Sequence, residues 1–127
     1  MAEGEDEDYN VPLVLAADID LTNVKVVITI PDLKVSSKLF GTVKPKNAKV
    51  TKKFESNSLE LTAVVKKNKK EIKYKKIVRK LPGEIIPDRC KIKYKKGFII
   101  LILVKAKESS WSKFLSKKGK LDQAEDD

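Results

Sequence analysis

Short stretches in which apolar and polar side chains alternate recur along most of this chain, separated by turn residues. A period of two places the apolar residues on one face of an extended strand, whereas a helix needs a period near 3.6. Repeated short runs of this kind are typical of antiparallel sandwiches and barrels. Strands are predicted at residues 11–19, 24–30, 48–54, 58–65, 71–81, 89–95 and 98–105. The sequence therefore predicts an all-β protein, a seven-stranded antiparallel β-sandwich.

The last two predicted strands differ sharply in character. Residues 89–95 carry lysine at every second position, whereas residues 98–104 contain no polar side chain, and a tight turn at Lys96 and Gly97 joins them. A strand that is apolar on both faces is expected to be covered on both sides. For the outer cover we expect the segment that carries Trp111 to fold back. The alternatives are residues 11–17 and a second subunit.

A short helix or turn is expected near the C-terminus, packed on the sandwich. Ser110 is a suitable N-cap, and Gly119 is a suitable terminator. Trp111, Phe114 and Leu115 follow the spacing i, i+3, i+4 of one helical face. Because little else in this segment is apolar, that face is expected to pack against the sheet.

Charge is distributed unevenly along the chain. The sequence has 28 basic and 18 acidic residues, and nine of the acidic residues lie within residues 3–8 and 122–127. The body between these ends therefore has 28 bases against nine acids, and it is expected to attract polyanions. We assign residues 1–10 to a disordered acidic tail, residues 11–116 to one β-sandwich domain, and residues 117–127 to a flexible tail that is first basic and then acidic.

Lysines form the outward faces of several predicted strands. Lys73 and Lys75 oppose inward apolar residues on one strand, and Lys91 and Lys93 do so on another. Facing lysines repel by up to about 1 kcal/mol per pair, which favours an anionic partner. Tyr74 and Tyr94 point inward by the same alternation, and Arg79 and Arg89 are the only arginines. Single-strand nucleic-acid binders usually expose aromatic rings, so an RNA- or DNA-binding domain is the alternative function and a protein partner is preferred.

Composition argues against catalysis. The chain has no histidine, so a serine or cysteine nucleophile lacks its ordinary base. One cysteine and scattered carboxylates give no metal-ligand spacing, so no metal or cofactor is expected, and Cys90 is predicted to be a core residue. No apolar run reaches the roughly 18–20 residues of a membrane span. The chain is expected to be a cytoplasmic or nuclear monomer that does not bind membranes.

The segment LPGEIIPDRCKIKYKKGFIILILVKAKESSW, residues 81–111, resembles the CS domain of cochaperones. The similar features are Leu81, the run Ile85-Ile86-Pro87, alternating aliphatic residues that end at Lys105, and a tryptophan six residues later in the pattern W-x-x-x-L. Upstream, VKVVITIPDL and the pair AKVTKKF and SLELTAVV are similar to the first core strands of that domain. Within the family, the chain looks most similar to the suppressor-of-G-two-allele-of-Skp adaptor and the calcyclin-binding, Siah-interacting adaptor.

This resemblance implies a non-enzymatic cochaperone or adaptor. CS domains bind the ATPase chaperone of the ninety-kilodalton heat-shock class or components of ubiquitin ligases through a sheet face. The resemblance further implies that Lys105, at the end of the last strand, contributes to that face. The candidate partner-binding residues are therefore Lys105, Lys73, Lys75, Lys91 and Lys93.

Overall fold

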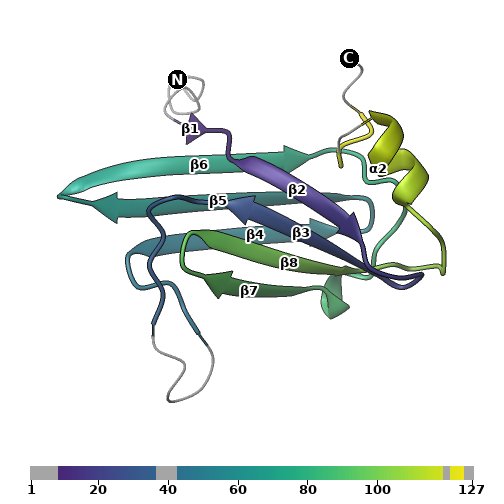
Figure 1. The fold of residues 1–127 in the computed structure, drawn as a ribbon, viewed down its shortest axis with the longest axis horizontal. Helices are drawn as coiled ribbons and strands as arrows, with labels where there is room; N and C mark the ends of the chain where they lie inside the picture. The colour runs from purple at the N-terminus through teal and green to yellow at the C-terminus, as the bar shows by residue number, and fades with distance from the viewer. Residues whose placement is uncertain (1–8, 37–42, 119–120, 125–127) are drawn as a thin grey trace.

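The computed structural model describes residues 9–36, 43–118 and 121–124. Two four-stranded sheets pack face to face, with strand orders β1-β6-β5-β4 and β2-β3-β8-β7 (Figure 1). The elements are β1 (Tyr9–Asn10), β2 (Leu13–Asp18), β3 (Asn23–Thr29), β4 (Ala48–Glu55), β5 (Ser58–Lys67), β6 (Lys70–Val78), the 3-10 helix η2 (Pro87–Arg89), β7 (Lys91–Lys95), β8 (Phe98–Val104) and α2 (Ser112–Lys118). The predicted β-sandwich is confirmed.

The alternating apolar positions of the central strands form the core between the sheets. On β3 and β8 the inward residues are aliphatic and at most 1% exposed, and those of β5 are at most 3% exposed. These residues are Val24, Val26 and Ile28 on β3, Leu59, Leu61, Ala63 and Val65 on β5, and Ile99, Leu101 and Leu103 on β8. Burial of one face fixes the register of each strand, because a slip of one residue would turn the apolar set outward.

Two tight hairpins connect strands at one end of the sandwich, on the left in Figure 1. The β5–β6 turn consists of Asn68 and Lys69, which have φ angles of 51° and 68°. Paired positive φ angles match the right-handed twist of the strands in a two-residue hairpin. Gly97 has a φ angle of 84° in the β7–β8 turn, which confirms the turn predicted there.

All seven predicted strands occur, as β2 to β8, and their ends differ from the prediction by up to three residues. The structure adds β1, which pairs in parallel with the outer edge of β6, Tyr9 opposite Lys73. The assignment of Tyr9 and Asn10 to a disordered tail is therefore wrong. The remainder of that tail, residues 1–8, lies outside the described residues.

The predicted C-terminal helix is present as α2, but it does not cover the outer face of β8. Trp111 is 1% exposed and belongs to the core cluster, together with Leu81 from the end of the opposite sheet. Phe114 is 47% exposed, and α2 contacts β2. The expected fold-back onto β8 is therefore wrong: the indole closes one end of the core, where its apolar surface finds more cover. Gly119 lies outside the described residues.

Leu121 and Asp122, which had been assigned to the C-terminal tail, are buried. The carboxylate of Asp122 accepts a hydrogen bond from the backbone N–H of Lys80 at 3.1 Å, and the N–H of Gln123 donates to the carbonyl of Lys80 at 2.7 Å. These contacts dock the segment after α2 onto the chain just beyond β6. Among the described residues, no helix has the length and apolarity needed to span a membrane.

Candidate protein-interaction surface

The outer face of the sheet β2-β3-β8-β7 carries exposed apolar side chains, with Thr29 and Lys25 of β3 between them. Its side chains come from three neighbouring strands, and we call this surface the apolar face. It consists of Leu13, Leu15, Val27, Phe98, Ile100 and Ile102. Leu13 and Leu15 are each 62% exposed, and Phe98 is 40% exposed. Large contiguous apolar surfaces are uncommon on monomeric soluble proteins and typically mark contact sites.

Strand register places these residues in rows across the sheet. One row joins Leu15, Val27 and Ile100 and ends at Lys93 on β7. The next row runs from Leu13 through Thr29 to Phe98 and ends at Lys95, and on the other side Lys25 lies between Ala17 and Ile102. Lysine therefore lines one side of the apolar face along its length.

Ile100 is only 6% exposed although no helix or strand of the described chain lies over it. Its cover comes from the sheet itself, since Val27 and Lys93 flank it on β3 and β7. Lysine stems lie along apolar surface while their charged ends reach water. This arrangement explains how an all-apolar strand can sit beside a lysine-rich one without a separate covering layer.

The edge strand β2 extends the apolar face and lacks charged protection along most of its length. Its sequence, LVLAAD, has no lysine and reaches a charge only at Asp18, whereas the edge strands β4 and β7 carry several lysines. Natural edge strands usually carry charges that discourage pairing with another chain. The open side of β2 is thus the edge most suited to contact with a partner.

The opposite outer face, on β6, β5 and β4, is polar. Lys73 and Lys75 project from β6, and their ammonium groups lie 5.8 Å and 5.2 Å from the centre of the Tyr9 ring. Thr62 lies beside Lys75 on β5, and Thr51 continues the row on β4. Lys73 and Lys75 are therefore on one side of the sandwich and Lys91 and Lys93 are on the other.

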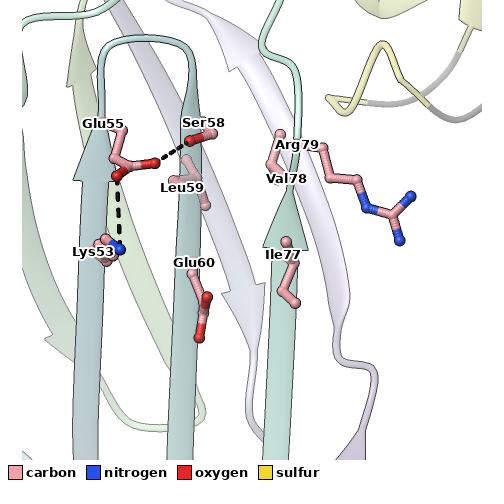
Figure 2. Close-up of a pocket in the computed structure, with 8 residues that line it drawn as sticks. All are labelled: Lys53, Glu55, Ser58, Leu59, Glu60, Ile77, Val78 and Arg79. Carbon is pink, nitrogen blue, oxygen red and sulfur yellow. Dashed lines mark hydrogen bonds and ion pairs between the residues drawn. The ribbon is translucent and has the colours of Figure 1, made fainter.

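A shallow hollow of about 220 Å³ lies on this polar face beside the β4–β5 hairpin (Figure 2). Lys53 forms an ion pair with Glu55 at 3.6 Å, and Glu55 also accepts a hydrogen bond from the Ser58 hydroxyl at 3.0 Å. The side chain of Arg79 extends away from these groups (Figure 2). The hollow is lined by both apolar and charged side chains of both signs, so it carries no functional assignment.

Lys105 is not at a surface. Its side chain is fully buried, and its ammonium group lies 2.6 Å from Asp18 Oδ1 on β2. It also donates hydrogen bonds to the carbonyls of Asp20 and Ser109, and it lies 5.7 Å from the centre of the Trp111 ring. The expected position of Lys105 on a binding face is corrected: its donors are occupied inside the protein.

Asp18 organises the same corner of the structure. Its second oxygen, Oδ2, accepts hydrogen bonds from the backbone N–H groups of Trp111 at 2.7 Å and Ser112 at 3.1 Å. Burial raises the pKa of Asp18, but the hydrogen bonds from Lys105 and Trp111 outweigh it, so the net pKa is lowered. Asp18 thereby caps the start of α2 from a distant strand, while the predicted cap, Ser110, accepts a longer bond of 3.4 Å from Ser112.

The predicted inward residues do pack against the core. Cys90, Tyr74 and Tyr94 are partly buried, and burial raises the pKa of each. The Cys90 sulfur accepts a hydrogen bond from the backbone N–H of Val104 at 3.4 Å. Within the described residues there is no cluster of three or more histidine, cysteine, aspartate or glutamate side chains that would hold a metal ion.

The exposed leucines of β2 and Phe98 were not among the predicted site residues. The sequence did contain a signal for this exposed surface. Residues 11–17 are apolar at both odd and even positions, so a strand in this segment has apolar side chains on its outer face as well as on its inner face. From the sequence, that segment is an alternative cover for the last strand. The structure pairs it with β3 in the same sheet.

Comparison with known proteins identifies the fold. No protein-family model matches the chain, and no curated protein matches it in sequence. Among solved structures, the chain is similar to heat shock protein 16.0 from Schizosaccharomyces pombe. The two share 15% sequence identity with a TM-score of 0.56, over 79% of this chain and 91% of that chain. The protein thus has the β-sandwich fold seen in that heat shock protein.

Proposed function

We propose that the protein is a non-enzymatic interaction module, a cochaperone or adaptor of the CS type that binds a protein partner through the apolar face. The observation that carries this proposal is the uncovered apolar face with its row of lysines. Such a surface suits a partner segment that presents apolar side chains next to acidic ones, because both kinds of contact are then satisfied. The sandwich fold shared with a heat shock protein supports the proposal.

Among the candidate lysines, Lys91 and Lys93 belong to this proposed site. They lie on β7, directly beside Ile102 and Ile100 of the apolar face. Lys73 and Lys75 project from the opposite sheet, and Lys105 supports the site from within by holding the end of β2. The proposed partners are the ninety-kilodalton heat-shock chaperone or a ubiquitin-ligase component, and the proposed setting is a monomer in the cytoplasm or nucleus.

The test is binding of the purified ninety-kilodalton chaperone, measured by calorimetry. Leu15→Ser and Phe98→Ser should each weaken binding by about tenfold or more, as truncation of a central apolar contact does. Ile77→Ser is the matched control, because Ile77 is 42% exposed but lies on the other sheet. Equal losses for Ile77→Ser and Phe98→Ser, or no loss for either, would contradict the proposed face.

The alternative function, binding of RNA or DNA, draws on the lysines of the polar face. It predicts that affinity for an oligonucleotide falls by about 10³-fold between 50 and 200 mM salt, as expected for many phosphate contacts. Under this alternative, Lys73→Glu and Lys75→Glu weaken binding, and Phe98→Ser does not. The two sets of variants therefore separate the two functions.

A further inference from the structure

Lysines from three separate parts of the chain converge at the hairpin end of the sandwich. They surround a hollow of about 350 Å³, which we call the basic hollow. Lys66 and Lys67 come from the end of β5, Lys96 from the β7–β8 turn, and Lys34 from the segment after β3. Asp32 is the one acidic residue among the described residues that line the hollow, and it pairs with Lys67 at 3.1 Å.

The walls of the basic hollow are held in place by the side chain of Asn47. Its amide oxygen accepts a hydrogen bond from the N–H of Lys34 at 2.8 Å, and its NH₂ group donates to the carbonyls of Asp32 and Lys66 at 2.8 Å and 3.1 Å. Asn47 thereby ties the backbones of Lys34 and Lys66 together, and the N–H of Gly97, next to Lys96, donates to the carbonyl of Leu33 at 3.0 Å. The mutual repulsion of the four lysines is relieved when an anionic group binds between them.

The chemistry of the lining favours carboxylates over nucleic acid. Among the described residues that line the hollow there is no arginine or aromatic side chain. Base stacking and bidentate phosphate recognition need those side chains, whereas a lysine ammonium binds a carboxylate as a point charge. The ligand class that fits is an acidic polypeptide segment.

The N-terminal end of β1 is oriented toward the hairpin end of the sandwich. Strand β1 runs parallel to β6 with Tyr9 opposite Lys73, so β1 and β6 both begin on the side of Lys70. Lys70 adjoins the β5–β6 turn, which borders the hollow. Residues 1–8 contain five acidic side chains and, when extended, span up to about 28 Å. The distance along β6 from Lys73 to Lys70 is about 10 Å.

We propose that the basic hollow is a binding site for an acidic polypeptide segment and that the chain's own residues 1–8 occupy it. The Tyr9 ring, held by Lys73 and Lys75, anchors the root of this segment. Tethering gives the segment an effective concentration in the millimolar range, so it outcompetes free acidic ligands of similar strength. The site therefore accepts an outside acidic segment only when that segment binds more tightly than residues 1–8.

The test compares two variants of the full chain with the same change in charge. The first carries Asp6→Asn, Glu7→Gln and Asp8→Asn; the second carries Glu125→Gln, Asp126→Asn and Asp127→Asn. Affinity for a fluorescent polyglutamate peptide is measured at about 50 mM sodium chloride, where charges of this spacing are weakly screened. We expect the first variant to bind at least about fivefold more tightly than the second.

An NMR spectrum of the backbone amides shows which residues respond when the charges of residues 6–8 are removed. In the first variant, the amide signals of Lys66, Lys67 and Lys96 should shift relative to the unmodified chain, and the shifts should disappear at about 500 mM sodium chloride. Adding Lys66→Glu and Lys96→Glu should remove the difference in peptide affinity. Equal affinities for the two neutralised variants, or shifts confined to other lysines, would overturn the proposal. This outcome is independent of the apolar face, which none of these substitutions touches.

Discussion

The Lys105 ammonium group lies 2.6 Å from a carboxylate oxygen of Asp18, inside the protein and 87 residues away in sequence. This contact ties the end of β8 to the end of the edge strand β2. Because Asp18 also accepts hydrogen bonds from Trp111 and Ser112, the same carboxylate fixes the start of the C-terminal helix.

Lys105→Met should destabilise the protein by about 3–5 kcal/mol, because it leaves the Asp18 carboxylate, whose side chain is only 11% exposed, without its counter-charge. The free energy of unfolding, measured with urea, checks this value. Lys107→Met is the control, since Lys107 is exposed and such substitutions change stability by about 0.5 kcal/mol or less. The double variant Asp18→Asn with Lys105→Met should lose less than the sum of the two single losses. Similar stabilities for Lys105→Met and Lys107→Met would show that the pair is unimportant.

Stability should fall in acid in a way that depends on Asp18. The pKa of Asp18 is lowered in the folded protein, so its contribution is present above the unfolded pKa of about 3.9 and is lost as the pH falls through the folded pKa. Asp18→Asn should therefore be much less stable than the unmodified protein at pH 7, and the gap should narrow at about pH 3. The midpoints of urea unfolding, measured for both proteins at both pH values, give this difference in stability. A gap that stays constant with pH would be evidence against this role of the carboxylate.

Gly83→Ala should weaken the packing around the buried indole. An added Cβ would lie 3.0 Å from Trp111 Nε1 and 3.4 Å from Cε2, so we expect a loss of about 1–3 kcal/mol from overpacking. Trp111 is the only tryptophan, and its fluorescence maximum should move in this variant.

Gly97→Ala provides the contrasting case. Its added Cβ would meet nothing within 4 Å, but Gly97 has a φ angle of +84°, so the cost is backbone strain of about 1 kcal/mol or more. Stability should fall while the tryptophan emission stays unchanged. A shift of emission with Gly97→Ala, or none with Gly83→Ala, would contradict the assigned packing.

Cys90 should react slowly with alkylating reagents. Burial raises the pKa of its thiol, although the hydrogen bond from the Val104 N–H lowers it in part, and only the thiolate attacks. The alkylation rate at pH 8 should rise by about tenfold or more when the protein is unfolded in urea. Equal rates in the folded and unfolded protein would mean that the thiol is freely accessible.

The alternation of side chains predicted the strands well because each central strand has one buried face. Val24, Val26 and Ile28 illustrate this, since a shift of one residue would expose all three. The hairpin at Gly97 was also predictable, because glycine reaches positive φ angles without strain. The two-residue strand β1 was not, since it depends on one long-range pairing with β6.

The position of Lys105 shows what local patterns leave out. The alternation that places Leu101 and Leu103 inward also places Lys105 inward, and this signal was in the sequence. A lysine is almost never buried without a partner, and the partner, Asp18, lies on a strand that the sequence does not connect to residue 105. The same reasoning applies to Trp111, which the sequence showed to need cover but whose ring lies beside Gly83 and Lys105, residues that local patterns do not connect to it.

The apolar face and the polar lysine face lie on opposite sides of the sandwich, with the full thickness of the core between them. A molecule seated on one of these faces leaves the other open, and neither needs the sandwich to change shape. Under the proposed function, the sandwich would hold an apolar-contact partner and a charged partner at a separation set by the thickness of its core.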